Sequence, residues 1–158
     1  MGSETKDARA THGTFVVERT YQASPERVFR AWADPERKRR WFAEGEGFTV
    51  ESFELDFRVG GIERSRFTPA GGPPLANDTY YHDIIDGRRI VFSYAMTIRD
   101  YRMSVSLATV ELEPNGSGGT LLRYTEQGAY FEHADGPDIR EQGWGSLLDA
   151  LERDFAEH

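Results

Sequence analysis

The amino-acid sequence predicts an α+β fold in which one antiparallel sheet is covered by one long helix. The C-terminal segment places Trp144, Leu147, Leu148, Leu151 and Phe155 at helical spacing on one face. Ahead of it lies a run of strand-like segments with short connections, which is typical of a meandering antiparallel sheet. Two short helical segments separate the first strand from the rest. An apolar helix laid against such a sheet can enclose a cavity.

The N-terminal part of the chain predicts one strand and two short helices. Residues 14–21 alternate between apolar and polar side chains, which indicates a strand. Ser24 is interpreted as the N-cap of a helix that has Pro25 in its first turn. By the same reasoning, Asp34 begins a second helical segment that ends near residues 41–42.

Six more strands and the closing helix complete the predicted order. The strands are expected at residues 48–55, 62–67, 78–85, 89–98, 101–112 and 120–130. Gly60-Gly61 permits a tight turn or a bulge, and Asp86-Gly87 favours a hairpin. The long helix is expected at residues 138–155. The sheet should therefore have six to seven strands.

The composition restricts the class of protein. The 158 residues are interpreted as a disordered leader, residues 1–12, and one domain, residues 13–158. The absence of cysteine excludes disulfides, thiolate metal sites and cysteine nucleophiles, and it suits a reducing compartment. The formal net charge of −8 argues against a broad nucleic-acid surface, and no apolar run is long enough to span a bilayer. We therefore expect a cytoplasmic protein that neither binds nucleic acid nor inserts into a membrane.

Several short motifs occur in a fixed order along the chain. They are residues 23–32, 34–36, 41–42, 60–61, 119–122 and 143–144, followed by the leucines at 147, 148 and 151. In these motifs, residues 14–155 resemble the START-like superfamily, also called SRPBCC or the birch-pollen-allergen fold. Within it, the chain looks like the branch related to the C-terminal domain of the activator of the heat-shock-protein-90 ATPase. The resemblance implies a helix-grip fold, in which a curved antiparallel sheet wraps around the C-terminal helix and leaves a ligand cavity.

Polar residues of the predicted strands are candidate contacts for a ligand. His82 could form a polar cluster with Asp78, Tyr80 and Tyr94, and a histidine is suited to general-base chemistry at neutral pH. A surface or structural histidine is the alternative. Glu126 is a candidate acid or base if burial changes its titration, and a solvated strand end is its alternative.

Basic residues have two interpretations as well. Arg66 could anchor a ligand carboxylate or pair with a neighbouring acidic residue at the surface. The basic run at residues 37–40 could contact an acidic partner or a phosphate, and a solvated helix face is the simpler explanation.

Large aromatic residues near the helices are expected to form the core or to border the entrance of the cavity. No residue is assigned a catalytic role. The complete set of candidate ligand contacts is Trp32, Trp41, Phe42, Arg66, Tyr80, His82, Tyr94, Tyr124, Glu126, Trp144 and Leu148.

Several site types are not predicted. The four histidines are scattered without metal-ligand spacing, no glycine-rich phosphate loop follows a strand, and no nucleophile elbow is present. We therefore expect neither a metal nor a cofactor.

Three functional hypotheses follow. The leading one is the binding of a small hydrophobic or amphipathic molecule between sheet and helix. The second is a chaperone-activator-like module that contacts a protein partner, and the third is a cavity enzyme of the polyketide cyclase or dehydratase type; both rest on the resemblance. A homodimer is possible in each case.

Overall fold

The computed structural model describes residues 8–45 and 47–158 of the chain. In chain order its elements are β1 (Thr11–Tyr21), α2 (Pro25–Ala33), α3 (Pro35–Lys38), η1 (Arg39–Ala43), β2 (Phe48–Leu55), β3 (Ile62–Pro69), β4 (Leu75–Ile85), β5 (Arg89–Ile98), β6 (Tyr101–Pro114), β7 (Thr120–Tyr130) and α4 (Pro137–Glu157). The predicted α+β class, the seven strands and the closing helix are confirmed.

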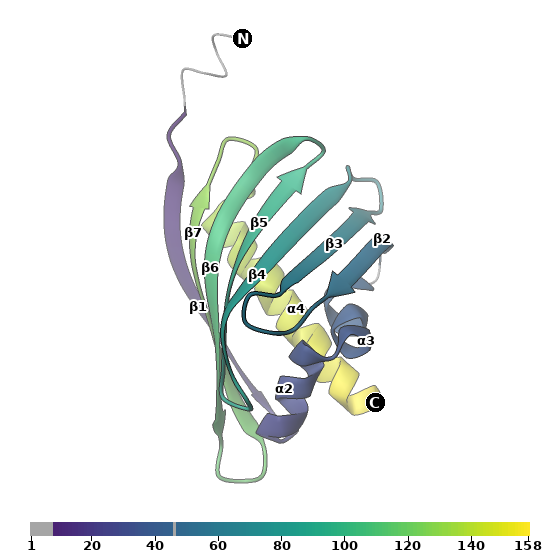
Figure 1. The fold of residues 1–158 in the computed structure, drawn as a ribbon, viewed down its shortest axis with the longest axis vertical. Coiled ribbons are helices and arrows are strands. Elements are labelled where there is room, and N and C mark those ends of the chain that lie inside the picture. The colour runs from purple at the N-terminus through teal and green to yellow at the C-terminus, as the bar shows by residue number, and fades with distance from the viewer. Residues whose placement is uncertain (1–7, 46) are drawn as a thin grey trace.

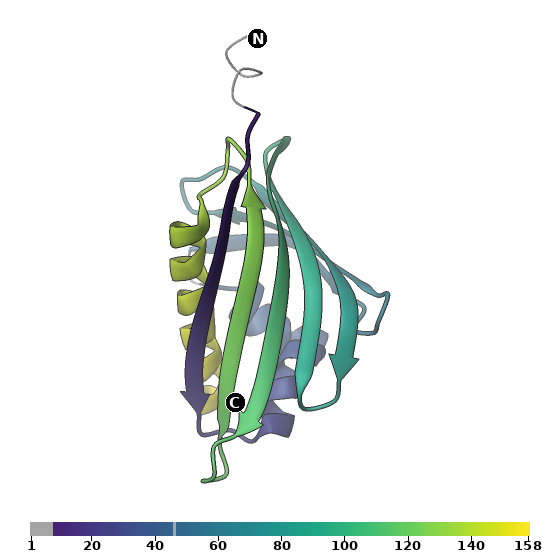
Figure 2. The ribbon, with the colours of Figure 1, turned by 90° about the vertical axis from the view of Figure 1, so that its left-hand side faces the viewer.

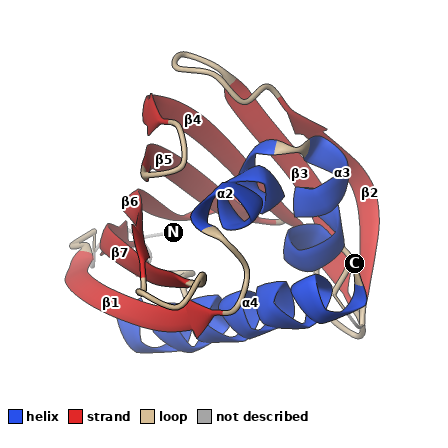
Figure 3. Cartoon of the chain, turned by 90° about the horizontal axis from the view of Figure 1, so that it is seen from below, coloured by secondary structure: helices blue, strands red, loops and turns tan. Residues whose placement is uncertain are grey.

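The strands form one antiparallel sheet in the order β1-β7-β6-β5-β4-β3-β2. The sheet curves strongly, and α2, α3 and α4 lie on its concave side (Figure 1). Seen from below, α4 extends across the open side of this curve, between the two edge strands β1 and β2 (Figure 3). A view from the side of β1 shows α4 running beside that strand for most of its length (Figure 2). The arrangement is that of a helix-grip fold.

Two strands begin earlier than the sequence predicts. Thr11 and His12, expected in the leader, already pair with Tyr130 and Ala129 of β7. Residues 1–7 of that expected leader lie outside the described part of the chain. β4 begins at Leu75 instead of residue 78, because its backbone there pairs with the end of β5. Backbone pairing, rather than side-chain alternation, sets both starts.

The two predicted helix caps are confirmed. The side chain of Ser24 accepts a hydrogen bond from the backbone N–H of Arg27. The carboxylate of Asp34 accepts from the N–H groups of Glu36 and Arg37. Each cap satisfies N–H groups that have no partner inside the first turn of its helix.

The second helical segment differs from the expectation, because it ends as a π-helix. The N–H of Glu44 donates to the carbonyl of Arg39 at 2.9 Å, five residues back, which defines the wider turn of η1. Within this turn Trp41 is buried, with its indole N–H donating to the carbonyl of Ala31 at 2.8 Å. The neighbouring Phe42 packs against the ring of Trp144 on α4.

The turn between β2 and β3 requires its double glycine. A Cβ at Gly61 would lie 2.0 Å from the carbonyl oxygen of Asp56, and Gly60 has φ of +85°. Glycine is therefore the residue that fits at position 61 without displacing the backbone.

The core lies between the concave face of the sheet and the helices. α2 buries Val28, Phe29, Ala31 and Trp32. The ring of Trp144 stacks on Tyr124 with centroids 4.1 Å apart, and Trp32 lies parallel to Trp144 at 6.1 Å. These aromatic contacts join α2, α4 and β7 in one cluster. No helix in the described part of the chain is long and apolar enough to cross a membrane.

Candidate ligand pocket

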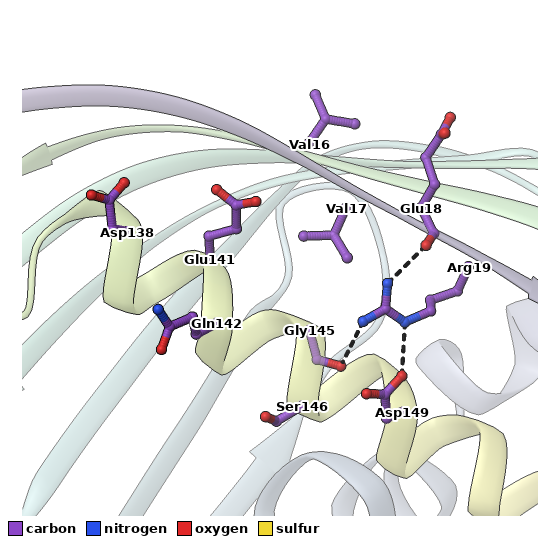
Figure 4. A pocket seen from close by; sticks show the side chains of 10 residues that line it. All are labelled: Val16, Val17, Glu18, Arg19, Asp138, Glu141, Gln142, Gly145, Ser146 and Asp149. Carbon is purple, nitrogen blue, oxygen red and sulfur yellow. Dashed lines mark hydrogen bonds and ion pairs between the residues drawn. The ribbon is translucent and has the colours of Figure 1, made fainter.

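Among the described residues, two hollows border the middle of α4, and a smaller polar one lies at its C-terminal end. The first lies between β1 and α4 and is lined by side chains such as Glu18, Asp138, Glu141 and Asp149 (Figure 4). Arg19 bridges it, donating to the carboxylate of Asp149 at 2.8 Å and to the carbonyl of Gly145 at 3.3 Å. This groove is open to solvent and lined by many polar side chains. Arg19 is already hydrogen-bonded to groups on the opposite wall of the groove. We interpret the groove as the hydrated junction between strand and helix.

The second hollow lies between η1, the concave face of β2 to β5 and α4, and its volume is about 480 Å³. Its walls are mainly apolar and include the rings of Trp41, Phe42, Phe48, Phe67 and Trp144. A concave site of this size with apolar walls and few polar groups has the usual character of a small-molecule site. We call it the α4 pocket.

One stripe of α4 forms a wall of the α4 pocket over more than three helical turns. The stripe consists of Arg140, Gly143, Trp144, Leu147, Ala150 and Arg153. These positions recur every three or four residues and so share one face of the helix. The same periodicity that predicted an apolar helix face therefore also describes a pocket wall.

Gly143 is an exposed position in the stripe of α4 that lines the pocket. A Cβ built at this position would meet no atom within 4 Å. Glycine inside a helix costs about 0.5–1 kcal/mol relative to alanine. The helix thus has lower intrinsic stability at a position beside the pocket where a larger side chain has space.

A fully buried carboxylate lies behind the pocket wall. Glu126 Oε1 accepts hydrogen bonds from the hydroxyls of Tyr94 and Tyr124, each at 2.7 Å. Its Oε2 accepts from Ser106 at 2.8 Å and from Tyr130 at 3.0 Å. Four hydroxyl donors on two oxygens use the normal capacity of a carboxylate. Glu126 is therefore a buried hub that joins β5, β6 and β7.

Tyr94 connects this hub to the pocket. Its hydroxyl donates to Glu126 and accepts hydrogen bonds from Arg140 at 3.0 Å and from the indole N–H of Trp144 at 3.1 Å. Burial raises the pKa of Tyr94, and the negative charge of Glu126 raises it further. The phenol is thus protonated and fully hydrogen-bonded, so it presents a ring rather than a free hydroxyl to the pocket.

Arg140 is the buried cation of the pocket. It binds both oxygens of Asp135, at 2.9 and 2.7 Å, and donates to Ser104 at 3.0 Å. Its Nη1 lies 3.8 Å from Glu126. Burial lowers the pKa of Arg140, but the hydrogen bonds and charges of Asp135 and Tyr94 outweigh burial and raise it above its ordinary value. The guanidinium is therefore a permanent charge that is already paired.

Two polar residues, Asn77 and Ser65, lie next to each other on the inward face of the sheet, and Asn77 lines the pocket. Asn77 is 6% exposed, lines the pocket and accepts a hydrogen bond at Oδ1 from Thr79 at 3.2 Å. Its side-chain N–H groups have no hydrogen bond among the described residues. Ser65, which pairs with Asn77 in the sheet, is completely buried, and its Oγ has no partner in the described part of the chain. Such groups are rare in folded proteins.

The structure brings together eight of the eleven candidate contacts from the sequence. Trp41, Phe42, Tyr94 and Trp144 line the pocket. The remaining four lie in the core directly behind it: Trp32, Tyr124, Glu126 and Leu148.

The other three candidates lie on the outer face of the sheet. Arg66 pairs with Asp78 at 2.8 Å, and His82 is hydrogen-bonded to Ser93 at 2.7 Å. Tyr80 is 46% exposed. Successive residues of a strand point to opposite faces, so the inward side chains of β4 are Asn77, Thr79 and Tyr81. The expected cluster of His82 with Tyr94 therefore does not form.

Sequence reasoning missed several residues of the pocket. Asn77 was overlooked because β4 was expected to begin at residue 78. Asn77 nevertheless has the same position in the strand alternation as the buried Tyr81. Gly143 was noted only as part of a motif. Arg140 sits on the same helix face as Trp144, and that spacing was available in the sequence. The burial of Arg140 depends on a distant partner, Tyr94, which the sequence does not place.

Among the described residues, no group of three or more histidine, cysteine, aspartate or glutamate side chains could hold a metal ion. The candidate pocket is thus built from aromatic rings, the ion pair of Asp135 with Arg140, the exposed Arg153 and the polar side chain of Asn77.

Comparisons with known proteins agree with this architecture. A structure from Rhizobium loti is 50% identical, covers 92% of this chain and 98% of its own, and has a TM-score of 0.84. A second, from Rhizobium leguminosarum, is 39% identical over 94% of this chain and 97% of its own, with a TM-score of 0.87. An AHSA1-like protein from Aeromonas hydrophila shares the fold at 20% identity, covering 92% of this chain and 93% of its own, with a TM-score of 0.71.

No curated protein matches the chain. Residues 22–156 match the family described as "Activator of Hsp90 ATPase homolog 1-like protein". That match extends from the end of β1 to the last turns of α4 and so includes every wall of the α4 pocket. The chain therefore belongs to the Activator of Hsp90 ATPase homolog 1-like family.

Proposed function

We propose that this protein binds a small, largely apolar molecule in the α4 pocket. The observation that supports this most directly is the hollow itself, which has a volume of about 480 Å³ and walls that include five aromatic side chains from η1, β2, β3 and α4. A hollow of this size and character is suited to a small apolar occupant.

The pocket walls supply the affinity in this proposal. Each Å² of apolar surface removed from water contributes roughly 25 cal/mol before the costs of ordering. The rings of Trp41, Phe42 and Trp144 offer such surface, and they are fixed by their own contacts with one another. Rigid aromatic walls lose little entropy when a ligand binds.

Binding is favoured over catalysis by the state of the polar groups. Asp135 and Arg140 are paired with each other, and the hydroxyl of Tyr94 is fully hydrogen-bonded. A general acid or base must reach the substrate with an exchangeable proton or a free lone pair. The cyclase-like enzyme therefore stays a prediction from the sequence.

The chaperone-activator hypothesis also stays a prediction. The basic run was its candidate surface, but Lys38 is buried against Glu63, Arg39 pairs with Glu44 and Arg40 pairs with Asp154. Three of the four cations are thus engaged within the fold. A pull-down with the chaperone, together with its ATPase rate, tests this alternative. The expected cytoplasmic location and a homodimer are likewise predictions.

The experiment for the binding proposal combines native mass spectrometry with one blocking variant. Protein purified from its own host should carry a small molecule that is released on unfolding. Gly143→Leu should lose that molecule, because the new side chain projects into the pocket. Glu141→Leu is the matched control, since it places the same side chain on the opposite, solvated face of α4. Equal ligand content in the wild type and Gly143→Leu would refute binding at this site.

A further inference from the structure

Two polar side chains lie side by side on the concave face of the sheet. Ser65 on β3 and Asn77 on β4 are paired residues, and both point inward. The Oδ1 of Asn77 is occupied by Thr79, which leaves the amide N–H groups of Asn77 as donors. These donors belong to a side chain that lines the α4 pocket.

These N–H groups make no hydrogen bond within the described residues, so an occupant of the pocket that supplies an acceptor gains a hydrogen bond there. The neighbouring wall is apolar, with Met96 paired to Asn77 on the other side. An apolar molecule that carries one acceptor oxygen would match both features. Tyr94 does not compete as the donor, because its proton is already given to Glu126.

The charges near this wall decide between a neutral and an anionic acceptor. Arg140 donates a hydrogen bond to Ser104 on β6. Ser104 is two strands away from Asn77 in the sheet, so the backbones of these two residues are about 10 Å apart. The single positive charge of Arg140 faces two carboxylates, Asp135 and Glu126. Arg153 also lines the pocket, but it is exposed, so solvent screens its charge. The buried groups therefore carry one more negative than positive charge, and they disfavour a third carboxylate in the same low-dielectric region.

We infer that the α4 pocket selects uncharged apolar molecules with a carbonyl oxygen, which accepts a hydrogen bond from the side-chain amide of Asn77. Ketones, aldehydes, esters and amides share this chemistry. The inference rests on the proposed function, because it assigns the orientation and class of a ligand in that same pocket.

Three probes of nearly equal shape test the inference. Acetonaphthone has the carbonyl, ethylnaphthalene lacks an acceptor, and naphthoate replaces the ketone with a carboxylate. Binding is followed by quenching of tryptophan fluorescence, since Trp41 and Trp144 line the pocket. The wild type should bind acetonaphthone about tenfold more tightly than ethylnaphthalene, the value of one well-formed hydrogen bond. Naphthoate should bind most weakly of the three.

Variants of Asn77 show whether that preference comes from its amide. In Asn77→Leu the ratio of the two affinities should fall to about one. Asn77→Asp keeps the shape and the acceptor for Thr79 but removes the donors, so it should also lose the preference for the ketone. Tyr80→Leu is the matched control on the outer face of the same strand and should retain the ratio. Circular dichroism and the unfolding midpoint establish that each variant is folded.

The outcomes separate the two proposals. If ethylnaphthalene and acetonaphthone bind equally well to the wild type, the pocket binds apolar molecules and the role of Asn77 is refuted. Tightest binding of naphthoate would overturn the neutral class. If no probe binds the wild type or competes with the co-purified molecule, the proposed function itself fails.

Discussion

The ammonium group of Lys38 lies 2.6 Å from Oε1 of Glu63, and both side chains are only 1% exposed. Tyr81 donates to the same carboxylate oxygen at 2.5 Å. The ring centroid of Phe42 is 4.7 Å from the ammonium. This buried pair connects the end of α3 to β3 directly before η1, whose aromatic side chains border one end of the α4 pocket.

Removal of one charge of this pair should be strongly destabilising. Glu63→Gln leaves the Lys38 ammonium buried without a counter-ion, and we expect a loss of about 3 kcal/mol in the free energy of unfolding. The double variant Lys38→Met/Glu63→Leu should cost far less than the sum of the two single changes. Urea denaturation of the wild type, Lys38→Met, Glu63→Leu and the double variant forms a double-mutant cycle. Additive losses would show that the two side chains are not coupled.

The Glu126 hub should depend on its negative charge more than on any single donor. Glu126→Gln introduces an N–H₂ group that faces hydroxyl donors, so at least one of the four hydrogen bonds is lost. We expect a destabilisation of about 3 kcal/mol, against about 1–2 kcal/mol for Tyr130→Phe, which removes one donor. Thermal and urea unfolding provide both values. A smaller effect for Glu126→Gln than for Tyr130→Phe would contradict the hub.

Alkaline pH should destabilise the fold from about pH 10 upward. Burial raises the pKa of Tyr94, Tyr124 and Tyr130 above the ordinary value of 10.0, and the charge of Glu126 adds to this. Below pH 10 both the folded and the unfolded chain keep these protons, so the contribution to stability is complete. Above it the unfolded chain loses protons first, and stability falls by up to about 1.4 kcal/mol per pH unit for each tyrosine.

Urea midpoints measured across this alkaline range test the effect. Tyr130→Phe should reduce the slope of stability against pH by the contribution of one tyrosine. Stability that stays constant to pH 12 would mean that these phenols titrate at the same pH in the folded and unfolded chain.

Alanine substitutions at two glycines should have opposite signs. Gly143→Ala should raise the free energy of unfolding by about 0.5–1 kcal/mol, because the new methyl group meets open space and favours the helix. Gly13→Ala should lower it, because its Cβ would lie 2.6 Å from two side-chain atoms of Pro137, at the start of α4. Differential scanning calorimetry distinguishes the two. A loss of stability in Gly143→Ala would show that the pocket has no free volume at this position.

The sequence was sufficient for features that depend on local pattern. The caps at Ser24 and Asp34 and the apolar face around Trp144 were predicted because neighbouring residues alone determine them. The π-helix at residues 39–43 was not predicted, since its side chains contact residues far away in the sequence, as Arg40 does with Asp154 and Phe42 with Trp144.

The candidate site was predictable only in part. The alternation of residues along β4 assigns its side chains to two faces of the sheet but does not determine which face is the concave one. Tyr80 and His82 lie on the outer, convex face. The hub at Glu126 needs donors from three strands, whose register the sequence leaves open. Partners far apart in the chain are therefore what the sequence could not supply.

The position of α4 in the chain has a consequence for the kinetics of folding. One wall of the α4 pocket comes from η1, near the start of the chain, and the other from a helix that follows all seven strands. Because β1 also pairs with β7, the contacts that close the fold are remote in sequence, and such contacts form slowly. A binding site that appears only when these contacts are complete is absent from the folding transition state. An occupant of the pocket should therefore prolong the lifetime of the native state by slowing unfolding, and leave the rate of folding unchanged.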